Sequence, residues 1–324
     1  MSLNSLFLFV KLHVSFIKNK SVYTFMRILI TGGSGLLGQY LNLHLSKDNE
    51  ILTVHSSTPG NCLNYRNMKT DLTGFNDLRS MFSLFNPEIL IHTAAISRPE
   101  ECDRLPVQHV LDINFNLNKH LTELCNEFKC RFIFTSTDLV YDGDSGMYLE
   151  ETSKLNPLSL YAKTKLDSEN YISDNSEDYI ILRTSLLYGI GLNGSTCNFH
   201  QMLNKFKRGE KVNLFHDQYR TPLWLSNAAS IIGEIINADI KNIILNFGGS
   251  ERVSRAELGE MTCDVFKYDN SLIEKISLKD AEVNNKVYDV SMNTELLNSF
   301  GIKQTGIEES IINIYQEELN GNTG

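Results

Sequence analysis

The stretch Arg27–Gly38, RILITGGSGLLG, decides the fold of this chain. Its first five residues form an apolar run typical of a buried strand, and glycines follow at Gly32, Gly35 and Gly38. The residues behind the glycines predict a helix, because leucines recur every four positions and therefore share one face. These leucines are Leu37, Leu41 and Leu45. A strand, a glycine-rich turn and a helix are the opening of a dinucleotide-binding βαβ unit.

Each glycine has a predicted role in this turn. Gly32 permits the tight bend, Gly35 lets a pyrophosphate approach the backbone, and Gly38 lets the helix pack closely on the strand. The free amides and the dipole at the start of the helix would bind the phosphates. An ordinary βα turn is the alternative, but a second strand at residues 50–55 arrives at the spacing of a βαβ unit. The predicted cofactor-binding residues of the turn are Gly32, Gly35, Leu36, Leu37 and Gly38.

The residues after the second strand bear on the choice of cofactor. An acidic residue there would hold the ribose 2′-hydroxyl of NAD and repel a 2′-phosphate. This chain has the neutral run His55-Ser56-Ser57-Thr58, so we predict that His55 and Ser56 contact the cofactor and that NADP(H) is preferred over NAD(H). No arginine adjoins the site, and Arg66 is only a distant candidate for holding a 2′-phosphate.

Strands and helices alternate along the first half of the chain, which predicts an α/β fold with a doubly wound parallel sheet of the Rossmann type. The rhythm loosens after residue 184. We therefore assign residues 26–184 to a cofactor-binding domain and residues 185–324 mostly to a smaller, mixed substrate lobe, with segments returning to the main sheet. The strands are expected at 27–31, 50–55, 88–92, 131–135, 179–183 and 243–247, and the helices at 75–85, 106–128, 158–172, 196–207, 226–236, 254–266 and 308–319.

Length, charge and cysteine usage exclude several classes of protein. The 324 residues carry 30 basic and 39 acidic side chains, a formal charge of −9, which disfavours nucleic-acid binding. Residues 1–25 are expected to be an extension outside the fold, and their apolar run at 6–10 is too short to span a bilayer. The six scattered cysteines lack the short spacing of a zinc site, so we predict free thiols in a reducing, cytoplasmic setting and no metal.

Tyr161 and Lys165 are the candidates for proton chemistry, because a spacing of four places both on one helical face. A nearby ammonium is expected to lower the pKa of the phenol and make proton exchange feasible near neutral pH. Thr137 closely follows a strand, at the sheet edge where ligands bind, and could donate to the same substrate oxygen. The alternative is an exposed helix with an incidental tyrosine and lysine.

Taken together, these residues resemble the extended short-chain dehydrogenase/reductases, and most of all their dTDP-4-dehydrorhamnose reductase (sugar-nucleotide-binding) branch. The resemblance runs from about residue 26 to the C-terminus. Its motifs are Gly32-x-x-Gly35-x-x-Gly38, Asp71-Leu72, Ala94-Ala95, Asn114, Ser136–Gly143, Tyr161-x-x-x-Lys165, Leu182–Gly189, Asp217-Gln218-Tyr219, Asn246–Gly249 and Asp289–Met292.

The resemblance implies a sugar-nucleotide reductase in which Thr137, Tyr161 and Lys165 are catalytic. Asn114 would support them structurally or through a water relay, although an asparagine that merely packs within a helix fits equally. Asp71 and Leu72 would border the adenine, and Asp71 also suits a turn or a helix cap. Ala94 and Ala95 would line the cofactor's ribose and pyrophosphate.

Departures from the family pattern leave the sugar open. The family's Asp-Gln-x-Gly-x-Pro-Thr stretch has Arg220 in place of glycine and Leu223 in place of threonine. Arg98 and Arg220 could contact a substrate phosphate or could be surface charges and ion-pair partners. An epimerase or dehydratase would need a further acid or base, for which the sequence offers Asp138, Cys102 or His200.

A third alternative is a non-catalytic regulatory subunit, like the relative in this branch that regulates methionine adenosyltransferase. A nucleotide sugar is the expected partner, with neither nucleic acid nor membrane. A homodimer formed through 106–128 and 158–172 is a further expectation from the resemblance.

Overall fold

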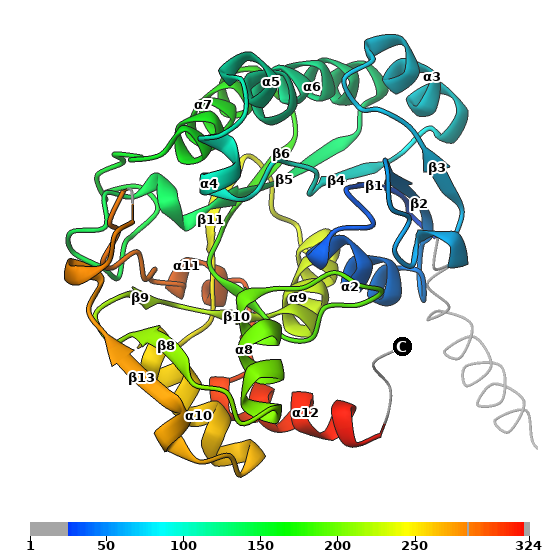
Figure 1. The fold of residues 1–324 in the computed structure, drawn as a ribbon. Helices are drawn as coiled ribbons and strands as arrows, with labels where there is room; N and C mark the ends of the chain where they lie inside the picture. Colours follow the sequence, from blue (N-terminus) through cyan, green and yellow to red (C-terminus); the bar gives the residue numbers. More distant parts are fainter. Residues whose placement is uncertain (1–24, 284, 321–324) are drawn as a thin grey trace, which may run out of the picture.

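A seven-stranded parallel sheet forms the centre of the computed structural model, which describes residues 25–283 and 285–320. The predicted extension at 1–25 thus lies, except for residue 25, outside the described residues. The strand order β11-β6-β5-β4-β1-β2-β3 confirms the doubly wound sheet (Figure 1). The strands are β1 (Arg27–Thr31), β2 (Glu50–His55), β3 (Asn67–Lys69), β4 (Ile89–His92), β5 (Arg131–Thr137), β6 (Tyr179–Thr184) and β11 (Ile243–Phe247).

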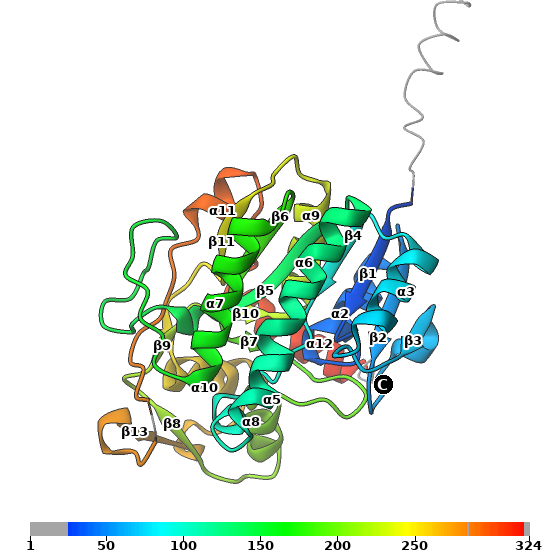
Figure 2. The same ribbon diagram turned by 90° about the horizontal axis from the view of Figure 1, so that it is seen from above.

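Helices cover both faces of this sheet, and its strands are apolar almost throughout because both faces are buried. On one face lie α2 (Leu36–Leu45) and α9 (Leu225–Asn237). On the other lie α3 (Phe75–Phe85), α6 (Leu117–Phe128) and α7 (Leu160–Asn175), which run side by side over the strands in Figure 2.

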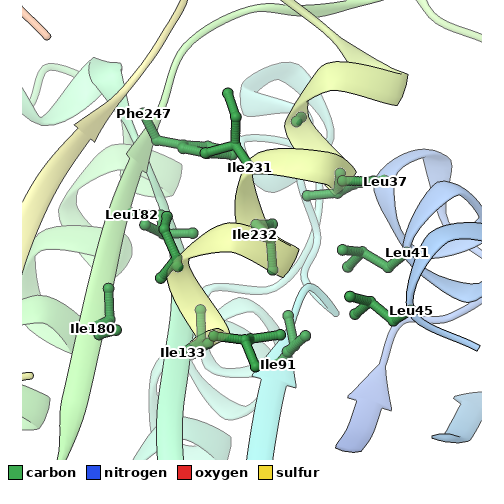
Figure 3. Close-up of a cluster of buried hydrophobic side chains, with 14 of the residues drawn as sticks. Leu37, Leu41, Leu45, Ile91, Ile133, Ile180, Leu182, Ile231, Ile232 and Phe247 are labelled. Atoms are coloured by element: carbon green, nitrogen blue, oxygen red, sulfur yellow. The ribbon is translucent and has the colours of Figure 1, made fainter. Parts of the chain in front are cut away.

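The predicted apolar face of α2 packs as expected. Leu37, Leu41 and Leu45 are all buried in one cluster, facing α9 and the sheet (Figure 3). The side chains that α9 and the strands supply to this cluster include Ile231, Ile232, Ile91, Ile133, Ile180 and Leu182.

The long helix expected at 106–128 is interrupted by a π-helical turn. It consists of α5 (Val107–Leu111), the π-helical segment η2 (Asp112–Asn116) and α6. Such turns are rare and often accompany functional sites. Periodicity could not reveal this one, because a single wide turn leaves the apolar pattern nearly intact.

The C-terminal half builds a smaller lobe around a core of its own. Three helices surround it: α8 (Asn198–Lys207), α10 (Arg255–Phe266) and α12 (Ile307–Leu319), at the bottom of Figure 1. Its strands form three short pairs: β7 (Leu187–Tyr188) with β10 (Leu223–Trp224), β9 (Tyr219–Arg220) with β12 (Val253–Ser254), and β8 (Val212–Phe215) with β13 (Ile273–Ile276). The described residues also form two short helices outside this lobe's core, α4 (Pro99–Cys102) and α11 (Glu295–Ser299).

Strand β11 comes from this half of the chain yet joins the main sheet beside β6. Across the described part of the chain, no helix has the length and apolar content needed to cross a bilayer.

Candidate active site

A cavity of about 810 Å³ opens at the carboxyl ends of the strands and extends toward the C-terminal lobe. This is the edge at which parallel sheets bind their ligands. Most of the predicted site residues line it, although they come from segments up to 133 positions apart in sequence. Those residues are Gly32, Gly35, Leu36, Leu37, His55, Ser56, Leu72, Ala94, Ala95, Thr137, Tyr161 and Lys165.

The glycine turn between β1 and α2 has the shape of a phosphate cradle. Gly32 has a φ of +72°, and a Cβ there would lie 2.6 Å from the Ala94 nitrogen. A Cβ on Gly38 would lie 2.2 Å from the Gly32 oxygen, so Gly38 lies beneath the turn. The N-cap residue Gly35 has no side chain to cap α2, which leaves the first amides of the helix available to an anion. The turn therefore fits the diphosphate of a dinucleotide.

The predicted adenosine end lies where this cavity meets a second one of about 1010 Å³. Ser56 lines both cavities, whereas Asp71 lines only the second and is exposed. The Asp71 carboxylate accepts hydrogen bonds from the Thr73 amide (2.9 Å) and hydroxyl (2.8 Å), which lower its pKa. Asp71 thus forms a turn and also borders the cleft, so the two roles considered for it are compatible.

Asn114 lies in the π-helical segment and is buried outside both cavities. Its amide accepts from the Ile96 nitrogen at 2.9 Å and donates to the Ile96 oxygen at 3.0 Å. These two bonds fix the strand-end loop that carries Ala94 and Ala95. In this structure Asn114 therefore holds a loop that borders the cavity and does not line the cavity itself.

Thr137 and Tyr161 meet at the floor of the cavity. Thr137 is the last residue of β5, and Tyr161 lies in the first turn of α7, where the Ser159 hydroxyl accepts a bond of 3.2 Å from the Ala162 amide. Both side chains are buried. Burial raises the pKa of Tyr161 strongly, and hydrogen bonding with Thr137 opposes the rise only in part.

Lys165 lies one turn further along α7 with its ammonium buried. Its Nζ donates to the Thr135 oxygen at 2.8 Å and lies 4.6 Å from the centre of the Phe134 ring. Burial lowers the pKa of Lys165 to about 8, against the opposing charge of Glu169. The prediction of a lowered pKa for Tyr161 is therefore wrong for this arrangement, because desolvation of the buried phenol has the largest effect and raises its pKa.

Two arginines and one carboxylate occupy the part of the cavity nearest the C-terminal lobe. Arg220 is buried, and its Nε lies 3.5 Å from Oδ2 of Asp138. Asp138 also accepts from the hydroxyls of Thr137 (3.4 Å) and Ser185 (3.2 Å). Burial raises the pKa of Asp138, which the charge of Arg220 opposes.

Arg255 is the second arginine of this group and was not among the residues predicted from the sequence. Its Nε donates to the Gln218 side chain at 3.2 Å. Burial, followed by the charge of Arg220, lowers the pKa of Arg255 to about 10. No motif marks Arg255, which simply follows the capping-box residue Ser254. Arg98 also lines the cavity but is exposed.

Two of the three candidates for an additional acid or base lie elsewhere. The Cys102 thiol donates to the Ile96 oxygen at 3.4 Å, and burial raises its pKa to about 11. His200 accepts a hydrogen bond from the Gly191 amide at 3.0 Å. Neither residue lines the cavity, whereas Asp138 does.

Comparison with known proteins identifies the family of this chain. The model of the RmlD substrate binding domain family matches residues 26–319. The dTDP-4-dehydrorhamnose reductase of Aggregatibacter actinomycetemcomitans is 30% identical over 70% of this chain and 75% of its own length. The probable low-salt glycan biosynthesis reductase Agl14 of Haloferax volcanii is 27% identical over 79% of this chain and 86% of its own.

A relative of another kind is also similar. The methionine adenosyltransferase 2 subunit beta of Xenopus tropicalis is 26% identical over 88% of this chain and 87% of its own. Among solved structures, dTDP-4-dehydrorhamnose reductase from Bacillus anthracis, in complex with NADP, superposes with a TM-score of 0.80, covering 91% of this chain and all of that one. Its identity is 19%, so the likeness concerns the fold.

The family match spans nearly the whole described chain, and the chain is an oxidoreductase of the short-chain dehydrogenase/reductase type. The predicted catalytic residues Thr137, Tyr161 and Lys165 line one cavity. The chain belongs to the RmlD substrate binding domain family, on the dTDP-4-dehydrorhamnose reductase-like branch of the extended short-chain dehydrogenase/reductases.

Proposed function

We propose that this protein reduces a keto group on a nucleotide-linked sugar with a nicotinamide cofactor, NADP(H) in preference to NAD(H). One observation carries the proposal: the hydroxyls of Thr137 and Tyr161 lie in the same cavity as the glycine turn. A carbonyl oxygen held between these hydroxyls would lie beside the cofactor cleft. The cavity of about 810 Å³ also has the size typical of small-molecule sites.

The side chains divide the chemistry as follows. When bound, a reduced nicotinamide supplies a hydride to the carbonyl carbon. Tyr161 transfers its phenolic proton to the carbonyl oxygen, and Thr137 donates a hydrogen bond that stabilises the negative charge developing there. The carbonyl thus becomes an alcohol. The raised pKa of Tyr161 keeps its proton in place across the neutral range.

The arginine pair supports an anionic substrate. Arg220 and Arg255 bring two positive charges to a largely buried wall where Asp138 supplies one negative charge. Guanidinium groups bind phosphate oxygens through paired, charge-assisted hydrogen bonds. The diphosphate of a nucleotide sugar suits this surplus charge. By the family resemblance, we propose a dTDP-linked 4-keto sugar of the dTDP-rhamnose pathway as the first substrate to test.

The competing functions are less well supported by this site. Epimerases and dehydratases need a second acid or base, and Asp138 is already engaged by Arg220, Ser185 and Thr137. A purely regulatory subunit has no need of a buried tyrosine, threonine and lysine at one cleft.

The decisive experiment is a panel of 4-keto nucleotide sugars incubated with NADPH carrying deuterium at the transferred position. We expect oxidation of NADPH and a product in which one deuterium is bonded to the former carbonyl carbon. An epimerised or dehydrated product without net NADPH oxidation would contradict a reductase. Tight NADPH binding without turnover of any sugar would instead favour the regulatory function.

Two further expectations remain proposals. The six cysteines are free, which supports a reducing, cytoplasmic setting. Pairing of two copies through the helices at 106–128 and 158–172 rests on the family resemblance, and light scattering of the purified protein would test it.

A further inference from the structure

The carboxyl ends of β2 and β3 place a lysine beside the predicted adenosine ribose. The two strands are parallel, with His55 in register with Lys69, and the Thr70 amide donates to the His55 oxygen at 3.0 Å. Lys69 therefore lies at the same sheet edge as Ser56 and Ser57. These two serines and Lys69 line the second cavity, which meets the main cavity at Ser56 and Thr70.

His55 indicates that this edge is built to receive a polar ligand. Its side chain is only 7% exposed and lines the main cavity, yet neither ring nitrogen has a hydrogen-bond partner. Buried polar atoms are nearly always paired, so an unpaired imidazole at a cavity wall points to a ligand that supplies the partner.

The positive charge of Lys69 has no acidic partner among the described residues. Between residues 25 and 320, residue 284 aside, it forms no ion pair. Lys119 also lines the second cavity, but its Nζ lies over the rings of Phe115 and Tyr171, 5.7 and 5.6 Å from their centres.

Arg66, the distant candidate for binding the 2′-phosphate, has its side chain at the amino end of β2, away from the predicted ribose site. Its guanidinium pairs with Glu50 at 2.6 Å. Glu50 is the first residue of β2 and His55 the last, so these positions are separated by roughly 16 Å at about 3.3 Å per residue.

We propose that Lys69, assisted by the hydroxyls of Ser56 and Ser57, binds the 2′-phosphate of NADP(H) and sets the preference of this protein for that cofactor. The inference rests on the cofactor site of the proposed function. An ammonium and two hydroxyl donors complement a phosphate dianion, whereas a plain 2′-hydroxyl would gain little from the lysine charge.

The test measures equilibrium binding of NADPH and NADH, followed by nucleotide fluorescence, for the wild type and for Lys69→Gln. We expect NADPH binding to weaken about ten-fold or more, as is usual when a hydrogen bond between charged groups is lost. NADH binding should change by less than two-fold. Raising the salt concentration should weaken NADPH binding to the wild type more than to the variant, because one charge pair has gone.

Arg66→Gln and Lys119→Gln are the matched controls, since each removes one nearby positive charge. Neither should alter the ratio of NADPH to NADH affinity. An equal loss for both nucleotides in Lys69→Gln, no loss for either, or the same selective loss in a control would overturn the inference. These binding results are independent of turnover, so a failed sugar panel with selective NADPH binding would refute the proposed reductase and leave the role of Lys69 standing.

Discussion

Glu169 and Arg183 form a fully buried ion pair between α7, the helix that carries Tyr161 and Lys165, and strand β6. The Arg183 Nη2 lies 2.8 Å from Oε2 of Glu169, and both side chains are at most 2% exposed. Arg183 also donates to the Tyr141 hydroxyl at 3.0 Å and to the Glu150 oxygen at 3.1 Å. The pair ties α7 to strand β6.

Replacing Arg183 by Met should destabilise the protein by about 3–5 kcal/mol, because it leaves the Glu169 carboxylate buried without its partner. Chemical denaturation measures the free energy of unfolding. The control is Arg79→Met, whose ion pair with Glu127 is exposed and should be worth about 1 kcal/mol or less. Equal losses in the two variants would show that the buried pair does not hold α7 in place.

Tyr161→Phe should lower kcat by about 10²-fold or more, since it removes the proton donor, while NADPH affinity stays nearly unchanged. Steady-state kinetics with the active sugar measure kcat, and a fluorescence titration measures the affinity for NADPH. Tyr171→Phe removes a hydroxyl from the same helix outside the cavity and should leave kcat at the wild-type value. A Tyr161→Phe variant that retains full turnover would contradict the proposed mechanism.

The activity should fall as the pH rises through about 8. Burial lowers the pKa of Lys165 to about 8, so its ammonium is present below that pH and lost above it. The pKa of Tyr161 is shifted in the opposite direction, since burial raises it, and the phenol keeps its proton through this range. We expect the Lys165 ammonium to hold the nicotinamide ribose, so the alkaline limb of kcat/KM against pH should report Lys165.

Substitutions on α7 test this assignment. Lys165→Met should abolish most of the activity, whereas Lys163→Met, at an exposed position on the same helix, should retain both the rate and the alkaline limb. An alkaline limb far above pH 8 in the wild type would show that the lysine ammonium is not required.

Gly38→Ala should destabilise the glycine turn and weaken cofactor binding. The added Cβ would lie 2.2 Å from the Gly32 oxygen, and overpacking of this kind costs about 1–3 kcal/mol. In Gly233→Ala, by contrast, the added Cβ lies 3.5 Å from a Leu45 methyl group, within α9. Replacing a helical glycine by alanine stabilises the folded protein by up to about 1 kcal/mol. Thermal unfolding should therefore show a lower Tm for Gly38→Ala and a higher Tm for Gly233→Ala than for the wild type.

The local elements of the cofactor half could be predicted because their signals lie within a few residues of one another. The apolar run of β1, the spacing of Gly32 and Gly38, and the leucines of α2 each express a local geometric requirement of the backbone. The same holds for Tyr161 and Lys165, whose spacing of four requires only a helix. The π-helical turn that holds Asn114 was missed because it alters backbone hydrogen bonds without altering the apolar pattern.

By itself, the sequence determined the parallel sheet and the glycine turn, since each depends on neighbouring residues, and it predicted the proton-transfer side chains from their spacing. Only the tertiary structure decided that Lys69 lies beside His55, that Arg255 joins Arg220, and that Arg66 is turned away toward Glu50. It also reversed the expected pKa shift of Tyr161. Parallel strand pairing places charged residues from distant segments side by side, and burial removes their hydration. Neither effect can be predicted from the residues of a single segment.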